Sequence, residues 1–127
     1  AGRNGNFLLN VGPMPNGKVQ EEFKERLHGI GRWLDEYGDS IYGTRNGPIE
    51  PGPWGVSTAK QDTVYLHVLN WNDSILALPA LNLEVKEARL LRNQAEVPFQ
   101  IIDKALLVTL PTRPTDLIDE VVILTVE

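Results

Sequence analysis

The sequence predicts a mainly β chain, with an antiparallel β-sandwich over residues 56–127 preceded by one strand and one amphipathic helix. Short β-branched runs separated by turn residues follow residue 56 at the spacing typical of a sandwich. Between residues 20 and 38, in contrast, apolar side chains recur every three or four positions, which is the helical period. A stretch rich in Pro and Gly separates the two patterns. We therefore expect three parts: residues 1–44, a connector at 45–55 and the sandwich at 56–127.

The first part contains the strand and the helix. The apolar run Phe7–Val11 ends at a Gly-Pro pair, which predicts a short buried strand followed by a loop. The helix is expected over Gln20–Gly38, with Glu21 and Glu22 near the positive end of its dipole. An amphipathic helix of this kind must pack its apolar stripe against another element. The stripe consists of Val19, Phe23, Leu27, Ile30, Leu34 and Tyr37.

The third part is a series of short strands with turn residues between them. Side chains alternate between the two faces of a strand, and residues 63–69 and 121–126 are apolar at both sets of positions. We therefore expect these two strands to be central or covered on both sides. The expected strands are 56–60, 63–69, 75–78, 85–91, 97–102, 105–110 and 121–126.

Composition narrows the classes of function. The net charge of −5 argues against a nucleic-acid partner, because Lys and Arg supply most of the affinity for phosphate backbones. No apolar run approaches the roughly 20 residues of a membrane helix, so no membrane insertion is expected. The absence of Cys removes disulfides, thiolate nucleophiles and Cys-based metal sites.

One motif resembles a phosphate-binding loop but fails its chemistry. Gly12 and Gly17-Lys18 have the spacing of such a loop, between a strand and a helix. That loop needs consecutive backbone N–H groups, and Pro13 and Pro15 have none. We therefore expect no nucleotide site here.

The carboxylates and histidines give weak signals of catalysis. Glycoside hydrolysis uses two carboxylates, roughly 5 Å apart in retaining enzymes. The sequence-adjacent acidic pairs are more simply explained as solvated charge. Neither His has a partner at metal-ligand spacing, so we expect no metal site and no Ser-His-Asp site. The residues in question are Glu21/Glu22, Asp35/Glu36, Asp119/Glu120, His28 and His67.

Three ring-bearing residues share one face of the expected strand if it stays regular. Tyr65, His67 and Trp71 could together form a platform on which a sugar stacks. Packing in the core or between domains is the favoured alternative, because large aromatics mainly supply buried area.

The order of three sequence tags resembles the C-terminal end of the family 29 glycoside hydrolases, the α-L-fucosidases. The tags are GNFLLNVGPMPNG, then IGRWLDEYGDSIYGTR, then GPWGVSTAKQDTVYLHVLNW. The resemblance implies that residues 1–44 are the last β-α unit of a catalytic (β/α) barrel and residues 56–127 a C-terminal sandwich. A complete barrel needs about 250 residues, so this chain cannot contain one.

The resemblance also implies what the chain does. The parent would be a retaining exo-glycosidase of terminal α-L-fucosyl linkages, without cofactor or metal. Its nucleophilic Asp and acid/base Glu belong to earlier barrel strands, so this part is expected to be inactive, and fucosylated glycans would bind to the catalytic domain. Phe7 matches an aromatic of the family's sugar pocket and is the one substrate-binding residue expected. The family suggests a periplasmic, secreted or lysosomal setting.

Two alternatives stay open beside this reading. The sandwich could be a carbohydrate-binding module that uses the ring platform, or the chain could be a purely structural dimerising domain. In either case the apolar stripe of the helix at residues 20–38 is exposed unless something covers it, so self-association through this helix is expected.

Overall fold

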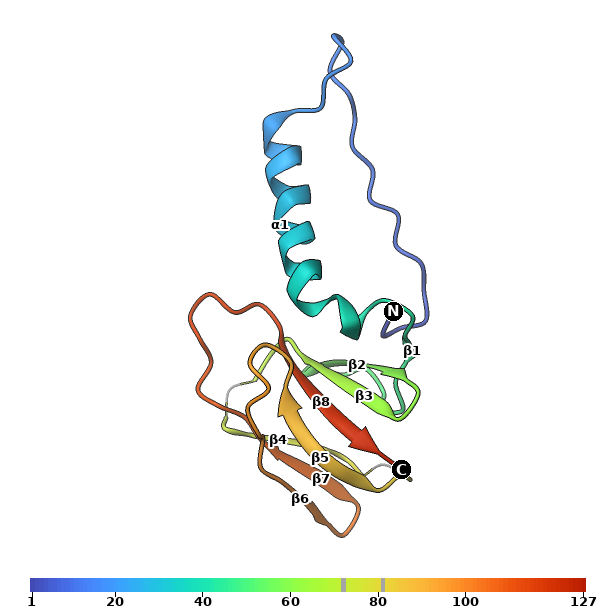
Figure 1. The fold of residues 1–127 in the computed structure, drawn as a ribbon, viewed down its shortest axis with the longest axis vertical. Helices are drawn as coiled ribbons and strands as arrows, with labels where there is room; N and C mark the ends of the chain where they lie inside the picture. The colour runs from blue at the N-terminus through green and yellow to red at the C-terminus, as the bar shows by residue number, and fades with distance from the viewer. Residues whose placement is uncertain (72, 81) are drawn as a thin grey trace.

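The computed structural model describes residues 1–71, 73–80 and 82–127. One helix stands above a β-sandwich, and the N-terminal segment runs as an extended coil (Figure 1). The elements are α1 (Glu21–Tyr37), the short helix η1 (Gly38–Ser40), β1 (Arg45–Asn46), β2 (Gly55–Lys60), β3 (Thr63–Val68), β4 (Ile75–Pro79), β5 (Val85–Leu90), β6 (Phe99–Ile102), β7 (Ala105–Thr109) and β8 (Glu120–Val126).

The strands form two antiparallel sheets, as the sequence predicts. The larger has the order β1-β2-β3-β8-β5 and the smaller the order β4-β7-β6. β8 therefore lies between β3 and β5, which confirms the expectation that it is central. In the β6–β7 hairpin the turn residue Asp103 has φ 53°, a left-handed conformation that Asp tolerates better than most residues.

The two sheets enclose the main core. One set of alternating side chains on each sheet points inward, and Leu66, Leu106 and Leu124 are fully buried there. Removing such a side chain costs about 2–5 kcal/mol, so this cluster supplies much of the stability of the fold. The core also contains Ile49, Val64, Val68, Leu76, Leu78, Val85, Ala88, Leu90, Val97, Val108, Leu110, Val122 and Val126.

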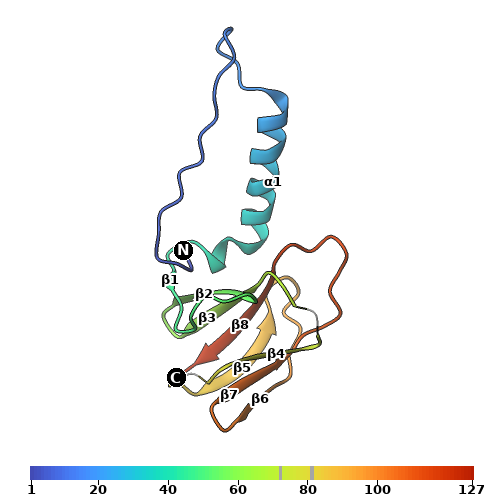
Figure 2. The ribbon, with the colours of Figure 1, turned by 180° about the vertical axis from the view of Figure 1, so that it is seen from behind.

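A second, smaller cluster covers the outer face of the larger sheet. Tyr37 at the end of α1 packs with Tyr65 of β3 and Val121 of β8, and Trp33 lies against them. The C-terminal end of α1 and η1 meet the sheet while the rest of the helix projects away from it (Figures 1 and 2). β3 is consequently covered on both faces, as its apolar alternation predicts.

Residues 7–11 do not form the predicted strand. Phe7 and Leu8 are each 85% exposed, and the first strand of the described chain begins at Arg45. A strand is stabilised only through hydrogen bonds to a neighbour, and these residues have none within the described chain. The segment turns at Met14 to Gly17 and then enters α1.

The remaining elements follow the predicted bounds closely. α1 begins one residue after and ends one residue before the expected Gln20–Gly38. The expected strand 97–102 begins only at Phe99, because Pro98 has no N–H for a ladder. β1 was not anticipated: it lies within the 45–55 connector and pairs with β2. Among the described residues, no helix has the length and apolar character needed to cross a bilayer.

Candidate functional site

Phe7 is the one substrate-binding residue that the sequence suggests, and it lies in the extended N-terminal segment. Its side chain is 85% exposed, and the segment extends away from the sandwich (Figure 2). The described residues therefore place no binding pocket around it, and its role stays a prediction.

The sugar-stacking platform of Tyr65, His67 and Trp71 is not formed. Tyr65 and His67 are 9% and 3% exposed, because the end of α1 covers this face of the larger sheet. Trp71 packs instead against the main core, and the Arg113 guanidinium lies 4.9 Å from the centre of its ring. The favoured alternative, that these rings serve packing, is correct.

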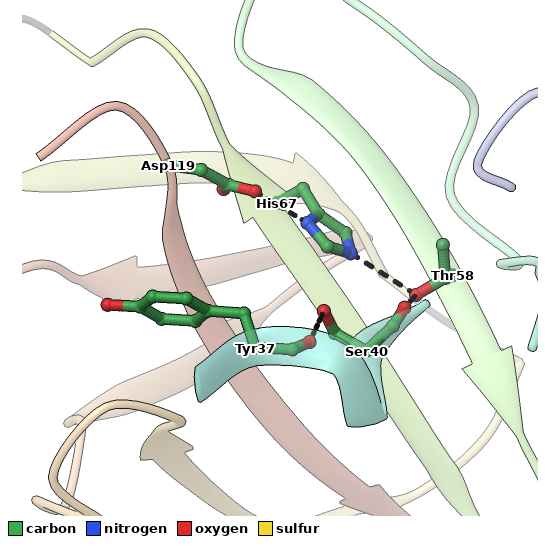
Figure 3. A network of polar contacts seen from close by, with 5 residues as sticks. All are labelled: Tyr37, Ser40, Thr58, His67 and Asp119. Atoms are coloured by element: carbon green, nitrogen blue, oxygen red, sulfur yellow. Dashed lines mark hydrogen bonds and ion pairs between the residues drawn. The ribbon is translucent and has the colours of Figure 1, made fainter. Parts of the chain in front are cut away.

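A buried polar network lies beneath the end of α1 and joins it to the sheet (Figure 3). His67 Nδ1 is 2.7 Å from Asp119 Oδ2, and its Nε2 is 3.4 Å from the Thr58 hydroxyl. The Thr58 hydroxyl donates to the Ser40 carbonyl at 2.6 Å, and the Ser40 hydroxyl donates to the Tyr37 carbonyl at 2.6 Å. Five residues from α1, η1, β2, β3 and the loop before β8 are thus linked.

The directions of these hydrogen bonds define the role of His67. The Thr58 hydroxyl has one proton, and its short contact with the Ser40 carbonyl uses it. Nε2 of His67 can then only donate to the Thr58 oxygen, while Nδ1 faces the carboxylate of Asp119. His67 is thus held from two sides, by Asp119 and by Thr58, and its ring links β2, β3 and the loop before β8.

The acidic pair Asp119/Glu120 is not solvated, contrary to expectation. Glu120 is fully buried, and the single Nε–H of Arg92 donates a bifurcated hydrogen bond to its two carboxylate oxygens, at 3.1 and 3.3 Å. Burial raises the pKa of Glu120, and Arg92 opposes that effect. Asp119 contacts His67 and Glu120 contacts Arg92, so both carboxylates have a side-chain partner inside the fold.

Tyr37 closes the network on the helix side. Burial raises its pKa to about 12, and a hydrogen bond with Glu36 acts in the same direction. Its ring stacks on that of Trp33, with centroids 5.2 Å apart, and the Trp33 ring lies 6.5 Å from that of His67. The aromatic rings therefore lie on the helix side of the polar network.

An open groove of about 570 Å³ lies beside the network. One wall belongs to α1, and the other belongs to the loops that follow β3 and precede β8. Asp119 lies at its margin, and the Oδ1 atom of this residue is buried without a hydrogen-bond partner among the described residues. The groove is lined by Glu25, Arg26, Gly29, Ile30, Trp33, Leu69, Ile118 and Asp119.

The described residues contain no cluster of three or more His, Asp or Glu side chains that could hold a metal ion. His28 is exposed on α1, and the acidic pairs Glu21/Glu22 and Asp35/Glu36 are exposed as expected. Among the described residues, the buried polar groups of the network link α1, η1, β2, β3 and the loop before β8.

Comparison with known proteins identifies the relationship. A family model described as Alpha-L-fucosidase matches residues 1–39. The tissue α-L-fucosidase of Macaca fascicularis is 32% identical over 123 residues, which cover 87% of this chain and 25% of that protein. The chain therefore spans about a quarter of the length of this curated relative.

Solved structures give the same relationship at the level of the fold. α-L-Fucosidase isoenzyme 1 from Paenibacillus thiaminolyticus superimposes with a TM-score of 0.88 at 37% identity, over 99% of this chain and 32% of that one. A family 29 (GH29) α-L-fucosidase from Bacteroides thetaiotaomicron gives a TM-score of 0.83 at 26% identity, over 93% of this chain and 28% of that one. Sequence and fold agree that this chain is related to the α-L-fucosidases of glycoside hydrolase family 29.

Proposed function

We propose that this chain is the C-terminal part of an α-L-fucosidase, a retaining exo-glycosidase that hydrolyses terminal α-L-fucosyl linkages, and that it serves as a structural accessory to the catalytic domain. Residues 1–44 would be the last β-α unit of the barrel, 45–55 the connector and 56–127 the sandwich. Fucosylated glycans would bind to the catalytic domain, as the Bacteroides enzyme binds a fucosyl fluoride derivative.

Two observations support this proposal: the part of the chain that the family model matches, and the small share of each relative that the chain covers. The family model matches residues 1–39, while the full-length relatives extend far beyond the part that this chain covers. The matched residues also include the two segments whose apolar side chains are left exposed in this fold. The segment at residues 7–11 has no strand neighbour, and α1 exposes Phe23, Leu27 and Ile30 by 38–44%. A barrel would supply both the neighbouring strands and a surface for the helix.

The chemistry of the site supports a non-catalytic role. Retaining hydrolysis requires one carboxylate as nucleophile and a second as acid/base, held rigidly about 5 Å apart. The buried carboxylates of this chain, Asp119 and Glu120, are each committed to a basic side chain. Phe7 would line the sugar pocket once neighbouring strands surround it.

Activity measurements test the proposal directly. The chain alone should release no 4-nitrophenol from 4-nitrophenyl α-L-fucopyranoside, whereas a longer product of the same gene should release it. Phe7→Ala in the longer product should raise KM more than it lowers kcat, because an apolar wall contacts the sugar in ground and transition states alike. Fucose release by the 127 residues alone, or a gene that encodes nothing beyond them, contradicts the proposal.

The exposed stripe of α1 favours a second property, self-association of the isolated chain. The N-terminal part of the stripe, at Phe23, Leu27 and Ile30, is 38–44% exposed, and exposed apolar patches promote association. We expect sedimentation velocity to show dimers or larger species in the native chain. The double variant Phe23→Glu/Leu27→Glu should sediment as a monomer, while Lys24→Glu on the same helix should not change the distribution. A native chain that stays monomeric at high concentration would rule out this association.

A further inference from the structure

The groove beside the polar network joins two parts of the chain that the family comparison separates. Its α1 wall, with Ile30 and Trp33, lies within the matched residues 1–39. Its other wall, with Leu69 and Ile118, belongs to loops of the sandwich outside that match. Any group that occupies the groove would therefore touch both parts at once.

The lining of the groove specifies an apolar occupant. Leu69 is 45% exposed, Ile30 is 44% exposed and Ile118 is 75% exposed. Three charged residues line the groove: Glu25 and Arg26 have opposite signs, and the Asp119 carboxylate contacts His67. A volume of about 570 Å³ is large enough for one or two side chains.

Resting on the proposed function, we propose that this groove receives an apolar side chain from the part of the longer α-L-fucosidase that lies outside these 127 residues. The relatives show how much chain is available: this one spans only 25% of the Macaca enzyme and 32% of the Paenibacillus enzyme. Residues 1–39, which include α1, match the α-L-fucosidase family model. The rest of the catalytic domain would therefore lie close to this helix. The groove opens along α1, beside the exposed stripe that the same domain would cover.

Occupation of the groove would lock α1 to the sandwich. The occupant would contact Trp33 on the helix and Ile118 on the loop that carries Asp119. It would also keep water from the His67–Asp119 contact, whose strength rises as water is removed. The catalytic domain would thus be joined to the sandwich through one filled recess, in addition to the stripe of α1.

A titration with indole tests the apolar character of the groove on this chain. The Phe23→Glu/Leu27→Glu background keeps the stripe from interfering. Indole should cause saturable ¹H–¹⁵N shifts at Ile30, Leu69 and Ile118. Ile118→Glu should weaken this binding at least fivefold, because it places a charge in the apolar lining of the groove. The variant should still fold, because the Ile118 side chain is 75% exposed.

A control variant distinguishes binding in the groove from non-specific binding of indole to exposed apolar side chains. Ile102→Glu alters an isoleucine that is 50% exposed on the smaller sheet and should leave indole binding within twofold of the parent. Equal losses in both variants, or no saturable shifts, overturn the proposal. In the native chain, dilution should move the amides of the α1 stripe only. Concentration-dependent shifts at Leu69 and Ile118 would mean that a second copy occupies the groove, which also overturns it.

The longer gene product distinguishes this proposal from the proposed function. The groove should already be filled there, so indole should cause no saturable shift at Leu69 or Ile118. If a longer product hydrolyses fucosides and still binds indole in the groove, the proposed function is supported, and the proposal that a side chain fills the groove is contradicted. A longer product with a filled groove and no fucosidase activity supports the occupant as a domain contact and contradicts the proposed function.

Discussion

His67 shows how strongly burial depends on partners distant in sequence. It is held by Asp119, 52 residues away, and by Thr58 on the neighbouring strand. The strand alternation correctly predicts which face it occupies, but it carries no information about what covers that face. The pairing of His67 with Asp119 could not be predicted, because it depends on the loop that leads into β8.

Glu120 illustrates the same limit for a carboxylate. Its position next to Asp119 looked like surface charge, yet the pairing of β8 with β3 buries it completely. A buried charge is tolerated only beside an opposite charge, and Arg92 supplies it from 28 residues earlier. Neither residue type nor spacing distinguishes this pair from an exposed one.

Replacing Arg92 by Met tests the importance of this pair. Arg92→Met leaves a buried carboxylate without a cation, and we expect the free energy of unfolding to fall by about 3 kcal/mol at pH 7. Burial raises the pKa of Glu120, so the folded state binds its proton more tightly than the unfolded state. The loss should therefore shrink as the pH falls through the folded pKa. Urea denaturation at several pH values measures it.

Arg89→Met is the matched control for that experiment. Arg89 pairs with Glu87 on the same strand, and both side chains are about 40% exposed. Exposed pairs contribute about 0–1 kcal/mol, so this variant should lose little stability at any pH. Equal losses for the two arginines would mean that burial of Glu120 does not govern the effect.

The raised pKa of Tyr37 determines how the free energy of unfolding should change at alkaline pH. Its pKa is raised by burial to about 12 from an ordinary value of 10.0, so the unfolded state releases the phenolic proton first. Stability should therefore fall as the pH rises from 10 to 12. Tyr37→Phe should reduce this loss; burial raises the pKa of Tyr65 as well, so part of the loss should remain. Thermal unfolding across this range, with the exposed Tyr42→Phe as control, checks the assignment.

Among the elements, those with local signals were predicted well. The 3.6-residue period located α1, and β-branched runs between turn residues located the seven longer strands. The strand at Phe7–Val11 was wrong because an apolar run indicates burial only when a neighbour exists to bury it. β1 was missed because two residues, Arg45 and Asn46, carry no periodic signal.

Two glycines in different elements should respond to Ala in opposite ways. At Gly55 in β2 a Cβ would lie 1.8 Å from the carbonyl oxygen of His67, and its φ is +147°. Gly55→Ala should lower the unfolding free energy by at least about 2 kcal/mol through strain and displaced backbone. A Cβ at Gly31 in α1 meets nothing within 4 Å, so Gly31→Ala should stabilise the chain by up to about 1 kcal/mol. Chemical denaturation of both variants measures the contrast, and a shared sign would contradict it.

On the scale of the whole molecule, stability is unevenly distributed. The sandwich encloses the main core between its sheets, while the stretch from residue 5 to the start of α1 lies outside both hydrophobic clusters. The two-layer arrangement was predictable from strand count and alternation. The order of strands within each sheet was not, because it depends on long-range pairings that no local pattern encodes.

Hydrogen exchange should reproduce this distribution. Amides of residues 7–11 have no hydrogen-bond partner among the described residues and should exchange at rates close to those of an unfolded peptide. Amides of β3 and β8, which are paired on both sides, should be the slowest. Mass spectrometry of peptic fragments would show the contrast, and protection of the 7–11 segment would contradict the fold described here.

The position of β8 constrains how the chain can be made. Among the strands of the described chain, β8 is the last to be synthesised, yet it lies inside the larger sheet, between β3 and β5. β3 and β5 therefore each have an unpaired edge until translation has passed residue 126. During that interval nascent chains on one polysome present complementary edges to each other, so the yield of native protein should depend on chaperones that shield them.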